Sequence, residues 1–320
     1  MSIKIAAPAS GTKLNLSESV EFRGSADGGI ATVSLFSPFG NNRFLLGKAS
    51  VIRGEWILSY KFNTSGKREV VVSGFDASNT MLDSEEVKIE LSESEDAFVF
   101  SEPTPAQKLQ GLTLWATFYN IHRAQSVVGG EPLLDMAGNS LGPTLSERDW
   151  CFAALEGTVQ VLEGDDKVKT FNFSGQGSSS QVDCAVLFPS LPNSVIQGMN
   201  QSRFTIARGE FGDGVKGFSL VPYRTIAVDP KVIPIGSVIY IPDARGRDFS
   251  LPSGKIVTHD GYFFAADTGG NINDNHIDVF LGIATSIEKF DFISSEPQST
   301  FDAFTIDNSL ITQSLESAHK

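Results

Sequence analysis

Three aspartates in the last third of this 320-residue chain end or interrupt short apolar segments, a pattern typical of a carboxylate active site. Asp229 follows RTIAV, Asp267 follows YFFAA, and Asp278 lies inside HIDVFLG. Strands are depleted in aspartate. A carboxyl group among apolar neighbours stays protonated or costs on the order of several kcal/mol. A general acid requires a protonated carboxyl, so we expect acid–base chemistry at these positions.

The segments around the aspartates predict strands and tight turns. We expect strands at 224–228, 237–241, 263–266 and 276–282, a glycine-containing turn at 268–270 and a loop at 271–275. Pro230 has no backbone donor, so Asp229 lies at the end of its strand. In the last strand, alternation places Asp278 on one face with His276 and Phe280, while the other face is apolar. Asp278 is therefore an ionisable group within an apolar strand.

Each aspartate also has a structural explanation, and the residues alone leave both explanations open. Asp229 can simply end a strand before its proline. Asp267 can accept hydrogen bonds from the amides of the glycine turn that follows it. Asp278 can face solvent if that side of the sheet is wet.

Together, the three segments resemble the 3D domain, a family named for its three aspartates that occurs in membrane-bound lytic transglycosylase A and related wall enzymes. The resemblance rests on AVDPKVIPIGS, AADTGG and HIDVFLG, with ATFYN similar to the family's first strand. It runs from about Leu112 to Gly282, with a long insert between residues 130 and 215.

The resemblance implies a double-psi β-barrel that cleaves the MurNAc–GlcNAc bond of peptidoglycan and leaves a 1,6-anhydro product. The family's acid/base aspartate corresponds to Asp278, and its other two aspartates correspond to Asp267 and Asp229. Family members often read GGAIKGNRID where this chain reads GGNINDNHID. Asn273, Asp274 and His276 therefore depart from the family pattern, which bears on the substrate contacts and leaves the aspartates in place.

We expect the substrate-binding residues to surround the aspartates, because aromatic faces pack on sugar rings and polar groups bind hydroxyls. The candidates are Thr117, Tyr119, Tyr223, Thr268, Gly269, Gly270 and His276. The tyrosines can equally be core residues. The sequence has no HxH or HExxH spacing and no GxSxG, so we expect no metal, no cofactor and no serine triad.

Short β-branched and aromatic segments between Gly and Ser turns predict a mainly β protein. We expect an immunoglobulin-like (Ig-like) β-sandwich at 1–92, a linker at 93–110, the double-psi β-barrel catalytic domain at 111–308 and a flexible tail at 309–320. The sandwich resembles bacterial Ig-like modules in GEWILSYKF and REVVVSGFDASN. We also predict strands at CFAALEGTVQVL and CAVLF, and expect the linker residues Phe98–Phe100 to be able to dock onto a neighbouring part.

The net charge of −13 and the pI of about 4.8 disfavour nucleic acid and anionic membranes as partners. No Lys/Arg cluster forms a local basic patch, and no run of 18 apolar residues predicts membrane insertion. We expect peptidoglycan glycan strands as the partner and a site of action in the periplasm or cell wall. MSIKIAAPAS lacks the apolar core of a signal peptide, so the export route stays open.

Two questions remain open, the state of the cysteines and the activity of the barrel. Cys151 and Cys184 are either a disulfide or two buried thiols. The barrel either cleaves glycan or binds and loosens the wall as expansin-like proteins do. A third alternative is an injected effector or lysin with the same chemistry, which adds a secretion or injection machine as a partner.

Overall fold

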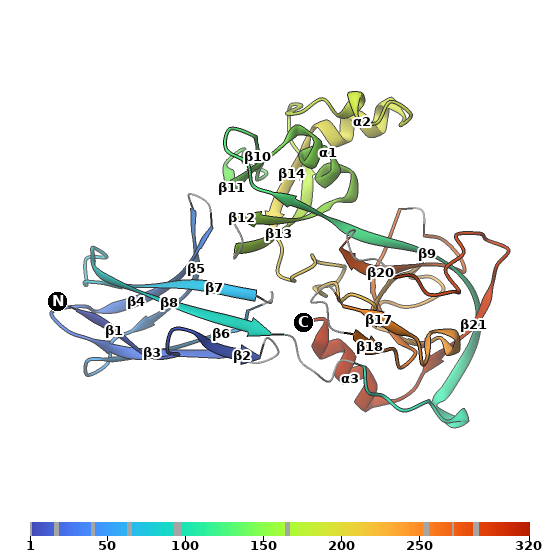
Figure 1. The fold of residues 1–320 in the computed structure, drawn as a ribbon, viewed down its shortest axis with the longest axis horizontal. Helices are drawn as coiled ribbons and strands as arrows, with labels where there is room; N and C mark the ends of the chain where they lie inside the picture. Colours follow the sequence, from blue (N-terminus) through green and yellow to red (C-terminus); the bar gives the residue numbers. More distant parts are fainter. Residues whose placement is uncertain are drawn as a thin grey trace.

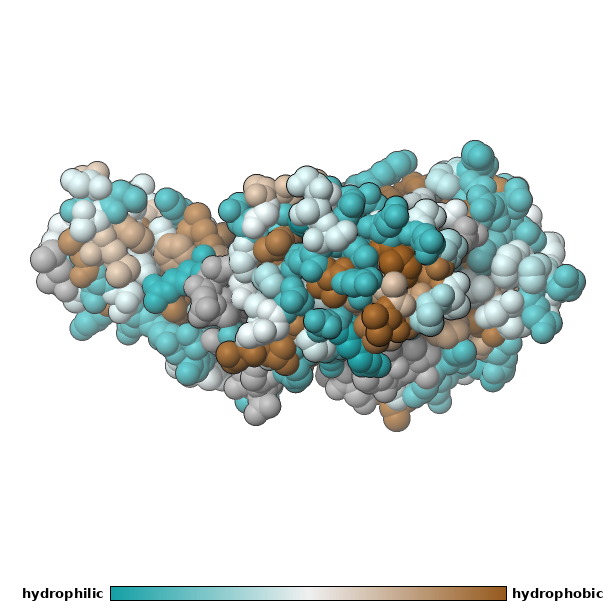
Figure 2. Space-filling view, turned by 90° about the horizontal axis from the view of Figure 1, so that it is seen from above, coloured by the Kyte–Doolittle hydropathy of each residue, from teal (hydrophilic) through white to brown (hydrophobic). Residues whose placement is uncertain are grey.

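The computed structural model describes residues 2–15, 19–39, 42–62, 66–92, 98–163, 167–251, 256–270, 272–283 and 288–320. The chain forms an N-terminal β-sandwich, a β-barrel and an insert that leaves and re-enters the barrel (Figure 1). A notch sets the sandwich apart as a smaller lobe (Figure 2). Strands dominate the described residues, which confirms the mainly β fold class. None of the described helices has the length and apolar character to cross a membrane.

The sandwich packs two sheets around one apolar core. The sheets have the strand orders β1-β3-β6 and β2-β8-β7-β4-β5. The strands are β1 (Ile3–Ala7), β2 (Thr12–Asn15), β3 (Val20–Ala26), β4 (Thr32–Phe39), β5 (Asn42–Ser50), β6 (Glu55–Tyr60), β7 (Gly66–Phe75) and β8 (Met81–Ser92). Alternate residues face inward, and Phe22, Trp56 and Val72 are buried together from both sheets.

The barrel closes six strands in the order β9-β20-β15-β19-β16-β21 and back to β9. They are β9 (Lys108–Gln125), β20 (His276–Ile283), β15 (Thr225–Ala227), β19 (Tyr262–Asp267), β16 (Val238–Tyr240) and β21 (Phe301–Ile306). β9 pairs in parallel with β20, as β15 does with β19, and the remaining barrel pairings are antiparallel. This closed sheet of mixed direction agrees with the expected double-psi β-barrel. Leu114, Phe263 and Val279 fill its interior.

β9 belongs to both the barrel and the insert. Its first part pairs with β21 and β20, and residues 122–125 pair with β12 of the insert. The insert's elements are β10 (Glu131–Leu134), β11 (Ser140–Leu145), α1 (Glu147–Glu156), β12 (Thr158–Glu163), β13 (Lys167–Gln176), η2 (Cys184–Val186), α2 (Asn193–Asn200) and β14 (Ser202–Ile206). α1 packs against β9 and β12, so one strand fixes the insert beside the barrel.

Two segments that we predicted as strands differ in the structure: CFAALEGTVQVL is wrong in its first half, and CAVLF is wrong throughout. Residues 151–156 belong to helix α1, which the Ser146 side chain caps and Gly157 ends in the left-handed conformation at φ 73°. The strand β12 begins only after this glycine. CAVLF starts with the short 3-10 helix η2. Both segments are short and apolar, and such runs do not distinguish helix from strand by periodicity.

The flexible tail predicted at 309–320 is also wrong. Helix α3 (Ser309–Ala318) begins after Asn308, whose side chain accepts hydrogen bonds from two N–H groups of the first turn. Ile311 and Leu315, one turn apart, pack into an apolar cluster of the barrel that includes Phe264, and His319 is fully buried. Burial of this apolar face stabilises the helix against fraying.

The end of the predicted linker lies on the barrel. The Phe98 ring contacts Phe249, and the guanidinium of Arg224 lies 4.0 Å from the Phe98 ring centre. The N–H of Phe100 donates to Asp260 at 3.1 Å. β9 begins at residue 108 rather than 111, after the 3-10 helix η1 (Pro105–Gln107). Residues 93–97 lie outside the described residues, and the remaining domain boundaries stay a prediction.

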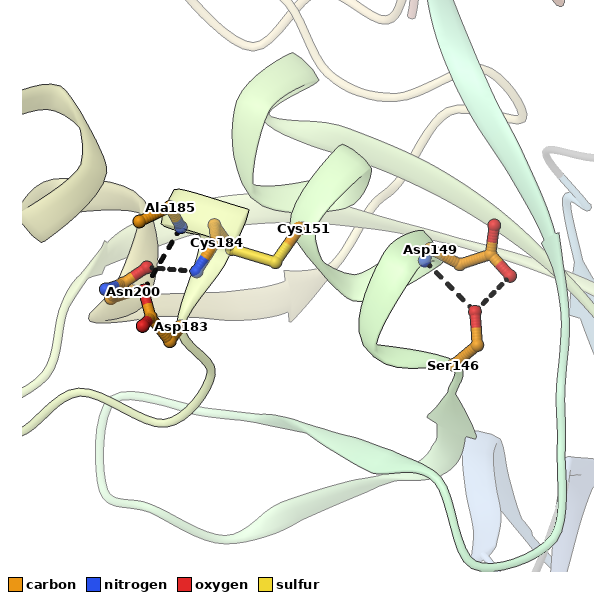
Figure 3. The surroundings of a disulfide bond; sticks show 7 residues. All are labelled: Ser146, Asp149, Cys151, Asp183, Cys184, Ala185 and Asn200. Atoms are coloured by element: carbon orange, nitrogen blue, oxygen red, sulfur yellow. Dashed lines mark hydrogen bonds between the residues drawn. A yellow bond between two sulfur atoms is a disulfide. The ribbon is translucent and has the colours of Figure 1, made fainter. Parts of the chain in front are cut away.

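Cys151 and Cys184 form a disulfide within the insert (Figure 3). It joins α1 to η2 across a sequence separation of 33 residues, and both cysteines are fully buried. The Asn200 side chain of α2 accepts a hydrogen bond from the Cys184 N–H at 2.9 Å. The disulfide therefore lies where three elements of the insert meet.

Candidate active site

Asp278 lies on β20 and points away from the barrel core. The row of side chains around it is set by the parallel register of β20 with β9, in which His276 lies opposite Trp115, Asp278 opposite Thr117 and Phe280 opposite Tyr119. The residues between them, such as Ile277 and Val279, fill the barrel interior. The alternation that the sequence predicted therefore places Asp278 on the outer face, on the strand next to the one that leads into the insert.

A chain of contacts leads from Asp278 to an aromatic stack. The Thr117 hydroxyl donates to Asp278 Oδ1 at 2.7 Å. Thr117 Oγ1 is also 2.8 Å from His276 Nε2, and since the hydroxyl has one proton, the histidine is the donor in that bond. The His276 ring stacks on Trp115 with ring centres 3.6 Å apart. These contacts fix Oδ1 of Asp278 and leave Oδ2 for another partner.

Asp267 ends β19 on the other side of β15. Ala227 of β15 lies opposite both Asp267 and Asp278, so one strand separates the two aspartates, or about 10 Å between Cα atoms at the usual strand spacing. The Tyr119 hydroxyl donates to Asp267 Oδ2 at 2.9 Å, and the Thr268 N–H donates to Oδ1 at 2.9 Å. β9 thus supplies a hydroxyl donor to each aspartate.

The pKa of each of these two aspartates lies above its usual value. For Asp278, burial raises the pKa and the hydrogen bond from Thr117 opposes it. For Asp267, burial is again the main cause and the charge of Asp278 adds to it, against the hydrogen bonds from Thr268 and Tyr119. Neighbouring carboxyl groups that repel each other favour a state with one of them protonated. Burial and the charge of Asp267 keep the pKa of Tyr119 well above its usual value, so Tyr119 remains a neutral donor.

Glu156 brings a third carboxyl group to this site from the insert. It is the last residue of α1. Burial, followed by the charge of Asp278, raises the pKa of Glu156, although much of the side chain is exposed. Glu156 was not among the predicted site residues, because its segment was predicted as a strand and no other signal in the sequence marks it.

Asp229 makes its hydrogen bonds to backbone rather than to the other two aspartates. Oδ1 accepts from the N–H of Lys231 and Oδ2 from the N–H of Asp274, each at 3.0 Å. Both hydrogen bonds lower the pKa of Asp229, so it is an ionised acceptor. Asp229 therefore fastens the loop before β20 to the end of β15, which is a structural role.

The prediction that Tyr223 binds substrate is wrong. Its side chain is 0% exposed, its ring packs 4.1 Å from that of Phe249, and its hydroxyl accepts from the Glu288 N–H. A glycan cannot reach it. The turn residues Thr268, Gly269 and Gly270 are exposed beside Asp267. Asn271 lies outside the described residues.

Trp115 was also missed, although the sequence carries its signal. It lies two residues before Thr117 and four before Tyr119, so strand alternation puts all three on one face. Within the described ranges, no three His, Cys, Asp or Glu side chains gather closely enough to hold a metal ion.

Comparison with known proteins supports the resemblance over the aspartate segments. Residues 224–290 match the 3D domain family, a range that contains all three aspartates. No curated protein sequence matches the chain.

Three solved structures are distantly similar. E. coli MltA with bound chitohexaose is 14% identical, with 61% of this chain and 72% of that chain covered at a TM-score of 0.40. The lytic transglycosylase LtgG of Burkholderia pseudomallei is 15% identical, with 74% and 75% covered at 0.32. The fibronectin(III)-like modules of Clostridium thermocellum CbhA are 18% identical, with 29% and 100% covered at 0.25. Similarity at this level carries no argument about function, and the Ig-like assignment of the sandwich stays a prediction.

Proposed function

We propose that the barrel cleaves peptidoglycan glycan strands at the MurNAc–GlcNAc bond, with Asp278 as acid and base. The observation that carries the proposal is the pair of part-buried aspartates, Asp267 and Asp278, with raised pKa on either side of β15. Both lie in the segment that matches the 3D domain family. Two carboxyl groups that burial and mutual repulsion keep from ionising together favour a state with one proton between them, which suits glycosidic bond cleavage.

In the first step, protonated Asp278 gives its proton from Oδ2 to the glycosidic oxygen. The bond from MurNAc C1 to that oxygen breaks, GlcNAc leaves as an alcohol, and positive charge develops at C1. The carboxylate of Asp267 stabilises this charge, and Glu156 adds negative potential from the insert side.

In the second step, the Asp278 carboxylate takes the proton from the C6 hydroxyl of the same MurNAc. The C6 oxygen bonds to C1, which gives the 1,6-anhydro product and restores protonated Asp278. No water is consumed in this route. In the hydrolytic alternative, a water molecule takes the place of the C6 hydroxyl.

Thr117 and His276 act as positioning residues for this proton transfer. The Thr117 hydroxyl holds Oδ1 in both steps, so the proton moves through Oδ2. His276 donates to Thr117 and thereby directs the hydroxyl proton to Asp278, and the stack on Trp115 orients the imidazole. The substrate implies a site of action outside the cytoplasm, in the periplasm or cell wall.

Digestion of purified sacculi, followed by mass spectrometry of the soluble products, tests the proposal. We expect anhydro-muropeptides. Products with reducing ends would keep glycan cleavage and replace the C6 hydroxyl with water. Binding to sacculi without soluble products would reject cleavage and favour the expansin-like alternative.

A further inference from the structure

A cavity of about 100 Å³ lies between the sandwich and the insert. The sandwich lines it mainly with residues of β4 and β7, and the insert with residues of β13 and of the segment after β14. β7 lies beside β13, so the cavity forms where the two parts meet (Figure 1). It shares no lining residue with the aspartate site.

Cationic side chains from both parts line this cavity, although the chain has a net charge of −13. Arg68 of the sandwich is 8% exposed and donates from Nη1 to the carbonyl of Lys67 at 2.8 Å. Lys169 of the insert is half-buried, and its ammonium lies 3.7 Å from the centre of the Phe44 ring. Burial, followed by the charge of Arg68, lowers the pKa of Lys169 to about 8. Two like charges therefore lie close together at the junction of the two parts.

Two carboxylates near the cavity, Glu210 and Asp213, interact with other cations. The charge of Glu210 acts on two guanidinium groups, those of Arg68 and Arg123. Arg208, which also lines the cavity, is ion-paired with Asp213 at 3.3 Å. Four cationic residues line the cavity, Lys67, Arg68, Lys169 and Arg208, against one carboxylate, Glu69, so the local charge balance favours an added anion.

We propose that this cavity binds a small oxyanion, a carboxylate or phosphate group, between Arg68 and Lys169. Within the described part of the chain, Lys169 forms no ion pair with a carboxylate. The cavity has room for such a group, and Tyr60 and Phe62 give it an apolar wall. Glu69 also lines it and disfavours a larger, highly charged ligand. A bound oxyanion offsets the repulsion between the cations and ties the sandwich to the insert.

Thermal unfolding of the full chain in sodium phosphate, acetate or chloride at equal ionic strength tests this site. We expect a saturable rise in Tm of ~2–4 °C with phosphate or acetate relative to chloride. The anion that saturates at the lower concentration identifies the preferred group. Lys169→Met should lose the rise and Lys169→Arg should keep it.

The matched control is Lys4→Met, since Lys4 is exposed on β1 and takes no part in the cavity. General salt effects on stability act equally on both methionine variants. A rise that persists in Lys169→Met, or an equal Tm in all three salts, would overturn the proposal.

Proton uptake gives a second test that does not depend on unfolding. At pH 8 the Lys169 amine is about half protonated, so binding of sulfate, which does not titrate, should draw a fraction of a proton onto it. Calorimetric titration with sulfate in two buffers of different ionisation enthalpy measures this uptake. Lys169→Arg should bind without uptake, and binding without uptake by the unaltered chain would contradict the role of Lys169.

Discussion

At the scale of single residues, the proposed chemistry depends on which oxygen of Asp278 is free to transfer a proton. Thr117 occupies Oδ1, and His276 in turn donates to Thr117. The register of β9 with β20 fixes these neighbours, because Asp278 lies opposite Thr117 and His276 opposite Trp115. Strands hold such contacts more firmly than loops do.

Thr117→Val tests this arrangement, since it removes the hydroxyl and nearly keeps the shape. The Thr117 hydrogen bond lowers the pKa of Asp278, so its loss should raise that pKa further. Asp278 then stays protonated to higher pH, so the alkaline limb of the pH–rate profile should shift to higher pH. The maximum kcat should fall by up to about tenfold, because the free energy of one positioning hydrogen bond corresponds to a rate change of this size.

Thr117→Ser is the matched control, because it keeps the hydroxyl and should keep the native pH profile. Measurement of kcat against pH for the two variants makes the comparison. An unshifted profile in Thr117→Val would mean that Thr117 does not act on Asp278.

The sequence predicted correctly that Thr117 and Tyr119 lie beside the aspartates, and their binding of substrate stays a prediction. Asp267 and Tyr119 are hydrogen-bonded, as are Asp278 and Thr117. It failed at Tyr223, because this residue has a left-handed backbone at φ 60° and turns its ring into the core. Alternation along a strand gives no information at such a position.

At the scale of elements, β9 is the feature that joins the barrel to the insert. One strand carries the donors to both aspartates and then pairs with β12, beside the helix that ends in Glu156. The sequence predicted the barrel strands because their apolar runs end at clear turn signals. It missed the body of α1, from residue 151 on, and the whole of α3, whose helical character depends on a cap and on packing against the barrel or insert sheet rather than on a long periodic pattern.

Loss of the disulfide should destabilise the insert. A cross-link across 33 residues restricts the unfolded chain, and its removal should lower the free energy of unfolding by about 3–4 kcal/mol. The doubly substituted chain with Cys151→Ala and Cys184→Ala, followed by urea denaturation, measures this loss. Reducing agent should destabilise the unaltered chain and leave the variant unchanged. A loss below about 1 kcal/mol would show that packing alone holds α1 against η2.

At the scale of the whole molecule, the fold creates a local positive charge that no segment of the sequence shows. The chain has a net charge of −13 and no Lys/Arg cluster, yet Arg68 and Lys169 meet between the sandwich and the insert. About one hundred residues separate them in the chain. Only the packing of the sandwich against the insert brings these residues together, so no sequence motif predicts that they are neighbours.

Two buried histidines should make the folded chain sensitive to acid. Burial is the main cause that lowers the pKa of His259 to about 3 and that of His319 to about 4, against about 6.5 in the unfolded chain. As pH falls below about 6.5, the unfolded chain binds protons that the folded chain does not. The free energy of unfolding therefore falls by up to about 1.4 kcal/mol per pH unit for each histidine. The raised pKa values of Asp267 and Asp278 act in the opposite sense, since the folded chain takes up those protons first.

His319→Gln isolates one of these contributions. The His319 ring contacts the carbonyl of Leu315 and the hydroxyl of Thr225, and the glutamine amide has a donor and an acceptor for the same partners. Urea denaturation between pH 7 and pH 4 should show a shallower fall in stability than in the unaltered chain. An identical pH dependence would mean that the pKa of His319 is the same in the folded and unfolded chains.

The activity of Asp278→Asn on purified sacculi tests whether Asp278 is the acid and base of glycan cleavage. Asparagine keeps the size of the side chain and an oxygen for Thr117, but its amide is neither acidic enough to protonate the glycosidic oxygen nor basic enough to take a proton back. We expect a fall of at least about 100-fold in the rate of release of soluble glycan fragments, with the fold intact. Asp229→Asn, which alters the loop anchor, should keep most of its activity. Full activity in a folded Asp278→Asn variant would rule out Asp278 as the acid and base.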